Sequence, residues 1–185
     1  MLVLCSTSAD EQDTEDSALC GLLREIAGGS SPALETLYRR TSASVYGFAL
    51  SILKNTHDAE DVLHDCYVTV WTAAAGYRPQ GKPMAWLLTI TRNLCLQKLR
   101  ERQRLSDLPQ EDWEPYLASR ETVTPEDRAV LTACMEQLSA EERQIVTLHA
   151  VSGFKHREIA ALLELPLPTV LSKYHRALKK LRQHL

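Results

Sequence analysis

Two helical segments joined by a proline-containing turn near the C-terminus constrain the fold of this chain more than any other feature. Residues 155–164 carry apolar side chains at spacings of three and four, which is typical of a helix with one buried face. Residues 165–167 interrupt this pattern with a proline and predict a turn. Pro168 suits the first turn of a second helix, which keeps the helical spacing to the end of the chain. This order predicts a helix-turn-helix.

The second of these helices is basic. From Lys173 onward it holds three lysines, two arginines and no acidic residue. Alone, such charges repel one another, whereas beside a DNA backbone they release counterions and bind phosphates. The residues expected on its outward face are Thr169, Ser172, Lys173, Arg176 and Lys180. The alternative is a solvated helical hairpin whose basic end complements the helix dipole. The combined pattern favours a DNA reader.

Charge is distributed unevenly along the 185 residues, although the net formal charge is only −3. Residues 92–104 hold five basic residues and one acidic residue, and residues 128–185 hold nine basic and five acidic residues. Between these basic blocks, residues 105–127 hold one basic and seven acidic residues. A nucleic-acid partner responds to such local blocks rather than to the average charge.

Signatures of metal binding, secretion, membrane insertion and catalysis are missing from the sequence. The five cysteines are widely spaced, so no zinc-ligand spacing occurs. Their odd number, without a signal peptide, fits the reducing cytoplasm. No window approaches the length of a membrane span, so membrane insertion is not expected. We find no phosphate-binding glycine loop and no nucleophile motif, and we therefore expect neither a cofactor nor an enzymatic activity.

Helical spacing without any alternating pattern predicts an all-α fold of two small helical domains. Residues 1–16 are polar and acidic and are expected to form a disordered tail. Residues 17–104 carry successive amphipathic helices, and residues 125–185 carry the helix-turn-helix domain. Residues 105–124 lack a sustained period and contain two prolines and several acids, which predicts a flexible acidic linker.

Two further surfaces in the N-terminal domain are candidates for binding. The helix expected at residues 84–104 offers amide and guanidinium groups on one face, and these groups can read base edges and bind phosphates. Trp86 on this helix can stack on an unpaired base, although a core position suits it as well. The preceding helix has an acidic stripe from Asp58 to Asp65, for which the alternative is an ordinary solvated helix start.

In this order the segments resemble the extracytoplasmic-function (ECF) group of bacterial sigma factors, within the sigma-70 family. The resemblance is carried by DAEDVLHDCYVTVW (58–71), PMAWLLTITRNLCLQKLRERQR (83–104) and the stretch 138–182, which contains the helix-turn-helix. It covers about residues 21–104 and 126–183, with an acidic linker between them as in the family. It implies that the first domain corresponds to sigma region 2 and the second to sigma region 4.

The resemblance also implies partners and roles. Core RNA polymerase would be bound through its β′ clamp helices and β flap, and the clamp-docking residues are Asp58, Glu60, Asp61 and Asp65. The residues that read and open the −10 promoter element are Arg78, Lys82, Trp86, Thr89, Arg92, Asn93, Gln97, Arg100 and Arg104. The residues that read the −35 element are Lys155, Thr169, Ser172, Lys173, His175, Arg176 and Lys180. An anti-sigma factor is a further implied partner.

The sequence departs from the family pattern in the helix-turn-helix. Glu164 and Pro168 stand where glycine is common, and Leu171 and Lys173 stand where basic residues are common. Because Arg and Lys bind DNA differently, the resemblance does not transfer the identity of the −35 bases. One alternative function is a stand-alone helix-turn-helix regulator, which leaves residues 58–104 without a role. Another is a metal or redox sensor whose Cys and His residues cluster in space.

Overall fold

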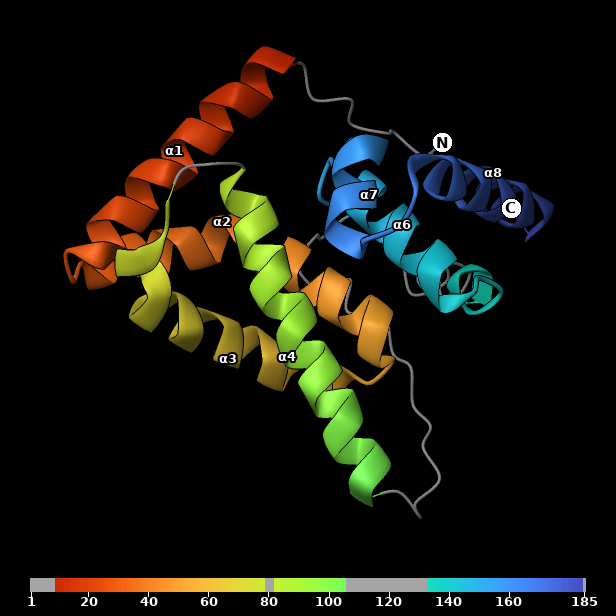
Figure 1. The fold of residues 1–185 in the computed structure, drawn as a ribbon, viewed down its shortest axis with the longest axis horizontal. Helices are drawn as coiled ribbons and strands as arrows, with labels where there is room; N and C mark the ends of the chain where they lie inside the picture. The colour runs from red at the N-terminus through yellow and green to blue at the C-terminus, as the bar shows by residue number, and fades with distance from the viewer. Residues whose placement is uncertain (1–8, 79–81, 106–132, 185) are drawn as a thin grey trace.

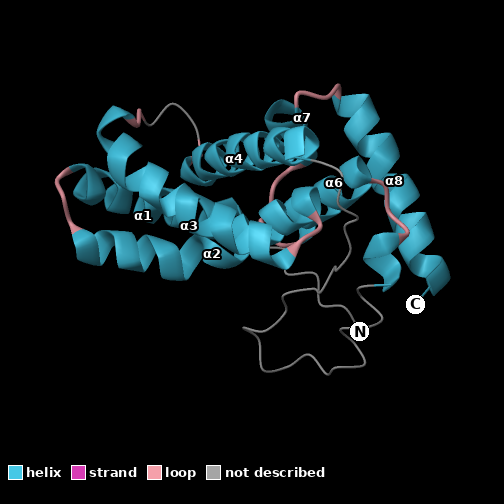
Figure 2. Ribbon diagram, turned by 90° about the horizontal axis from the view of Figure 1, so that it is seen from below, coloured by secondary structure: helices cyan, strands magenta, loops and turns pink. Residues whose placement is uncertain are grey.

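The computed structural model describes residues 9–78, 82–105 and 133–184, and no strand occurs among them (Figures 1 and 2). The helices whose two ends lie within the described residues are, in chain order, α1 (Ala9–Ala27), α2 (Ser31–Leu53), α3 (Thr56–Ala73), the 3-10 turn η1 (Ala74–Gly76), α4 (Pro83–Leu105), α6 (Ala140–Ala150), α7 (His156–Leu163) and α8 (Leu167–His184). The predicted all-α fold with two helical domains is confirmed. The predicted linker lies almost entirely outside the described residues.

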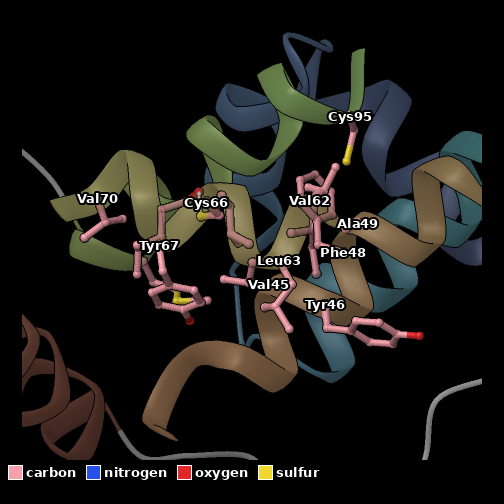
Figure 3. Close-up of a cluster of buried hydrophobic side chains, with 14 of the residues drawn as sticks. Val45, Tyr46, Phe48, Ala49, Val62, Leu63, Cys66, Tyr67, Val70 and Cys95 are labelled. Carbon is pink, nitrogen blue, oxygen red and sulfur yellow. Dashed lines mark hydrogen bonds between the residues drawn. The ribbon is translucent and has the colours of Figure 1, made fainter. Parts of the chain in front are cut away.

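Helices α1 to α4 pack around one apolar core, part of which Figure 3 shows between α2, α3 and α4. Phe48 of α2 and Leu87 of α4 are fully buried there. Local signals set the helix ends. The Ser30 hydroxyl accepts a hydrogen bond from the Ala33 amide and caps α2, and the Asn55 side chain caps α3 in the same way. Burial of the apolar faces then stabilises the bundle.

Helix α1 begins at Ala9, so the predicted disordered tail over residues 1–16 is wrong for residues 9–16. Residues 1–8 lie outside the described residues. Two contacts explain the difference. Glu15 lies 3.5 Å from the Arg40 guanidinium, and Asp16 lies 3.8 Å from the Lys82 ammonium. Acidic residues in the first turns of a helix also complement the positive end of its dipole. The acidic composition that predicts disorder therefore favours the start of this helix.

Helices α6, α7 and α8 form the C-terminal domain, and α7 and α8 form the predicted helix-turn-helix. A reciprocal capping box starts α6, because the Ser139 hydroxyl accepts from the Glu142 amide while the Glu142 carboxylate accepts from the Ser139 amide. Glu164 ends α7 in the left-handed conformation with φ +56°, which favours glycine. A glutamate thus takes a backbone geometry at the end of α7 that glycine adopts most easily.

The two domains pack against each other. Helix α6 lies along α2, and α7 lies against α4 (Figure 1). Ile145 and Leu148 of α6 are fully buried in the same apolar cluster as Phe48 of α2. Two ion pairs cross the interface, Lys82 Nζ to Glu158 at 3.0 Å and Arg92 to Glu164 at 3.7 Å. The N-terminal half of α4 therefore faces acidic groups of the helix-turn-helix.

Candidate nucleic-acid and protein interfaces

Helix α8 turns a polar face outward, away from its contacts with α6 and α7. Ser172, His175 and Arg176 are exposed on this face, as predicted from the sequence. Lys155, at the start of α7, is also exposed, whereas Thr169 is half-buried. The exposed residues of α8 that sequence reasoning did not assign to this face include Leu171, Lys179 and Arg182. Leu171 and Lys179 each lie four residues from His175, and this helical spacing is the signal that could have identified them.

Lys173 and Lys180 are both paired with acids of α6, and their side chains are 21% and 40% exposed. The Lys180 ammonium lies 2.7 Å from the carboxylate of Glu142, whose side chain is only 5% exposed. Lys173 of α8 pairs with Glu141, which precedes Glu142 on α6. Both acids belong to α6, which packs on α8. Burial raises the pKa of Glu142, but hydrogen bonds from Lys180 and Ser139 outweigh it and hold this pKa below its usual value.

An aromatic and imidazole cluster joins α6, α7 and α8. The rings of His149 and His156 stack with centroids 4.7 Å apart, and the ring of Tyr174 meets both at their edges. His149 Nδ1 lies 2.9 Å from the carbonyl oxygen of Phe154. Burial lowers the pKa of His156, and the neighbouring His149 and His175 lower it further. The cluster therefore favours the uncharged imidazole of His156.

Helix α4 exposes a continuous polar face. Thr89, Asn93, Gln97 and Arg100 lie on it at helical spacing, and all four side chains are exposed. Arg78, in the preceding loop, is exposed as well. The side chain of Arg104 lies outside the described residues. This face presents hydroxyl, amide and guanidinium groups to solvent, which is the chemistry that binds base edges and phosphates.

The other predicted α4 contacts are partly engaged within the protein. Arg92 is half-buried in its ion pair with Glu164, and Lys82 contacts both Glu158 and Asp16. Trp86 is half-buried, and its ring lies 5.0 Å from that of Tyr77. These three residues border the exposed α4 face. In this arrangement of the two domains they serve the packing of the chain.

The acidic stripe on α3 divides into two pairs. Asp58 has a side chain that is 16% exposed and contacts Lys98 at 3.7 Å and also Arg102. Asp61 shares the Lys98 ammonium, and the hydrogen bond from Lys98 is the main cause that lowers the pKa of Asp61. Glu60 and Asp65 are exposed, and so is Asp61, whose side chain is 63% exposed in spite of its ion pair. The stripe thus both fastens α3 to α4 and presents carboxylates to solvent.

Two apolar side chains extend the exposed face of α3 beyond Asp65. Val68 is 65% exposed and Trp71 is 41% exposed, one and two turns after Asp65. Sequence reasoning missed both as site residues, although their spacing from Asp61 and Asp65 places them on the same face. An exposed aromatic and an aliphatic residue beside carboxylates suit a protein partner better than DNA, whose phosphates repel carboxylates.

Metal and thiol chemistry find little support in the described part of the chain. No group of three or more His, Cys, Asp or Glu residues there is arranged to hold a metal ion. Cys66 and Cys95 are free and buried, and burial raises the pKa of Cys66 to about 11 and that of Cys95 to about 12. Of the helices in the same described ranges, none is long and apolar enough to cross a membrane.

Comparisons with known proteins agree with this division into two domains. Residues 37–105 match the family model of Sigma-70 region 2, and residues 128–181 match that of Sigma-70, region 4. The chain is 30% identical over 169 residues to the ECF RNA polymerase sigma factor SigK of Mycobacterium sp. (strain KMS), covering 87% of each chain. It is 28% identical over 171 residues to SigK of Mycobacterium ulcerans (strain Agy99), covering 89% of this chain and 91% of that relative.

Two solved structures share the fold. The sigma factor RpoE of Bartonella quintana, in complex with the anti-sigma factor NepR, aligns with a TM-score of 0.69 and 23% identity, covering 81% of this chain and 94% of RpoE. CnrH, in complex with the cytosolic domain of CnrY, aligns with a TM-score of 0.64 and 24% identity, covering 90% of this chain and 96% of CnrH. These alignments span most of each chain.

Proposed function

This chain belongs to the ECF group of sigma-70 family RNA polymerase sigma factors, and from that membership we propose how its surfaces divide the work of promoter recognition. A sigma factor of this group directs core RNA polymerase to specific promoters and initiates transcription there. The observation that carries the proposed division is that the exposed residues form three chemically distinct faces, two polar and basic faces on α4 and α8 and one acidic and apolar face on α3.

The exposed face of α8 reads the −35 element in the major groove. Ser172 and His175 offer hydrogen-bonding groups to base edges, and Arg176 offers a guanidinium to bases or phosphates. Lys155 and Lys179 are exposed cations at the border of this face and bind phosphates. Lys173 and Lys180 contribute mainly by fastening α8 to α6, through Glu141 and Glu142.

The exposed face of α4 binds the −10 element. Asn93 and Gln97 carry the amides that can read a base, and Arg100 continues the face toward the backbone. With the preceding loop, Asn93 holds an extruded base of the non-template strand, and the contact offsets part of the cost of unstacking. Lys82 and Arg92 join this surface once their ion pairs with Glu158 and Glu164 separate.

The exposed face of α3 docks on the β′ clamp helices of core RNA polymerase. Glu60 and Asp65 supply exposed carboxylates, and Val68 and Trp71 supply the apolar area that a stable interface needs. Asp58 acts mainly within the chain through Lys98 and Arg102, whereas the 63% exposed Asp61 pairs with Lys98 and also extends the docking face. The C-terminal domain reaches the β flap of the same enzyme.

Three further parts of the proposal follow from the family. The protein carries out no bond chemistry of its own, and it acts in the cytoplasm, where it meets the polymerase. An anti-sigma factor regulates it. One of the two structures with this fold supports this last point, because it holds the sigma factor RpoE in complex with the anti-sigma factor NepR. A stand-alone DNA-binding regulator is not favoured, since it gives the α3 and α4 faces no role.

The division of roles is tested with the complex of this chain and core polymerase. Asn93→Ala is expected to weaken binding to a fork DNA with an unpaired −10 segment by about tenfold, and to leave binding to duplex −35 DNA unchanged. Arg176→Ala is expected to weaken binding to duplex −35 DNA and to leave binding to the fork DNA unchanged. Arg39→Ala, which removes an exposed cation of α2 outside both faces, is the matched control. If either variant loses affinity equally for the fork DNA and for the duplex −35 DNA, the proposed division of roles is contradicted.

A further inference from the structure

One residue of α8 does not follow the amphipathic pattern of its helix. Leu171 is 37% exposed, and it lies on the polar face with Ser172 and His175. The inward face of α8 is apolar, with Val170 and Ala177 fully buried. Leu171 belongs neither to the apolar core of the described residues nor to the partly buried side chains that pack against it. Folding therefore gives no reason for a leucine at this position.

The position of Leu171 within α8 is where a recognition helix meets base edges. It is the fifth residue of the helix, which begins at Leu167, and a recognition helix reads bases mainly near its N-terminal end. Its neighbours on the exposed face, Ser172, His175 and Arg176, are polar or charged. An isolated apolar side chain among them faces whatever apolar group the bound DNA presents.

The major groove presents one apolar group, the C5-methyl group of thymine. All other base-edge groups there are hydrogen-bond donors or acceptors, which leucine cannot satisfy. We propose that Leu171 is a specificity-determining residue that packs against the methyl group of one thymine in the −35 element. This inference rests on the proposed −35 function of α8 and adds the base that one side chain selects.

The size of the effect follows from burial of a single methyl group. Removing one buried methyl or methylene group weakens an apolar contact by about 0.8 kcal/mol, which is about fourfold in affinity at 25 °C. Deoxyuridine differs from thymidine by that methyl group alone and keeps both base-pairing and groove hydrogen bonds. Replacing thymine by uracil therefore isolates the proposed contact without changing the protein.

The test uses the full chain bound to core polymerase and a promoter selected with that complex. Each thymine of the −35 element, on both strands, is replaced in turn by deoxyuridine, and promoter affinity is measured by competition. One replacement is expected to lower the affinity about fourfold. Leu171→Ala is expected to lower affinity for the thymine promoter by a similar factor and to be insensitive to the same replacement. Val151→Ala, at another exposed apolar position of this domain, is expected to keep the full sensitivity.

The outcomes separate this inference from the function on which it rests. Absence of any deoxyuridine-sensitive position in the unmodified protein overturns it without the need for a variant. Equal sensitivity of the Leu171→Ala complex and the unmodified complex overturns it as well, because the methyl contact then belongs to another residue. If the chain confers no promoter binding on core polymerase, the proposed function fails, and the inference fails with it.

Discussion

Replacing Asp58 by Asn separates a structural carboxylate from a docking carboxylate on α3. The Asp58 side chain is 16% exposed and contacts Lys98 and Arg102, which are themselves 25% and 28% exposed. Charge-assisted contacts contribute about 1.5–3 kcal/mol when buried, and exposed ion pairs contribute about 0.2–1 kcal/mol. The intermediate exposure suggests about 1 kcal/mol for each of the two contacts. Asp58→Asn is therefore expected to lower the free energy of unfolding by about 2 kcal/mol.

For a chain of this length, about 2 kcal/mol corresponds to a fall of about 4–8 °C in Tm, which calorimetry resolves. Glu60→Gln is the matched control on the same helix, since Glu60 is exposed. This control is expected to keep Tm and to slow association with core polymerase, an effect that shrinks as salt increases. If Asp58→Asn keeps its Tm but loses affinity for core polymerase, the structural role assigned to Asp58 is wrong.

Three further predictions address the other contacts. A double variant, Glu158→Gln with Glu164→Gln, removes two partly exposed ion pairs between the domains. It should shift the equilibrium toward separated domains by about tenfold. Fluorescence energy transfer between labels on α3 and α8 measures this shift. Because burial lowers the pKa of His156, the unfolded chain binds a proton at this residue more readily than the folded chain does. The free energy of unfolding should therefore fall as pH drops below about 6.5. In urea unfolding experiments, His156→Gln should reduce this pH dependence. Lys180→Met should lower Tm, whereas Lys179→Met should keep Tm and reduce the salt slope of promoter binding by about one.

Much of this fold could be predicted from the sequence because helical periodicity is a local signal. The helix-turn-helix was predicted at residues 155–164 with a turn at 165–167, and α7 and α8 lie there. The same periodicity placed Asn93 and Gln97 on an exposed face of α4. The start of α1 was missed, because acidic residues, which predict a disordered segment, also favour a helix N-terminus.

The partners of individual charges could not be predicted, because they depend on packing between distant segments. Glu142 and Lys180 are 38 positions apart and meet only when α8 lies on α6. Asp58 meets Arg102 only when α3 lies on α4. A sequence shows that a helix is basic, whereas the folded chain decides which cations are neutralised by acids and which remain exposed. Leu171 and Lys179, by contrast, were missed although their helical spacing of four from His175 could be read from the sequence.

The central claim is that this chain gives core RNA polymerase the ability to initiate at specific promoters. In vitro transcription with bacterial core polymerase, with and without the chain, on a genomic promoter library tests it most directly. The account predicts discrete start sites that require the chain and share a −35 and a −10 motif. If no promoter fires while the chain alone shifts duplex DNA, the account is contradicted, and a stand-alone regulator explains the helix-turn-helix better.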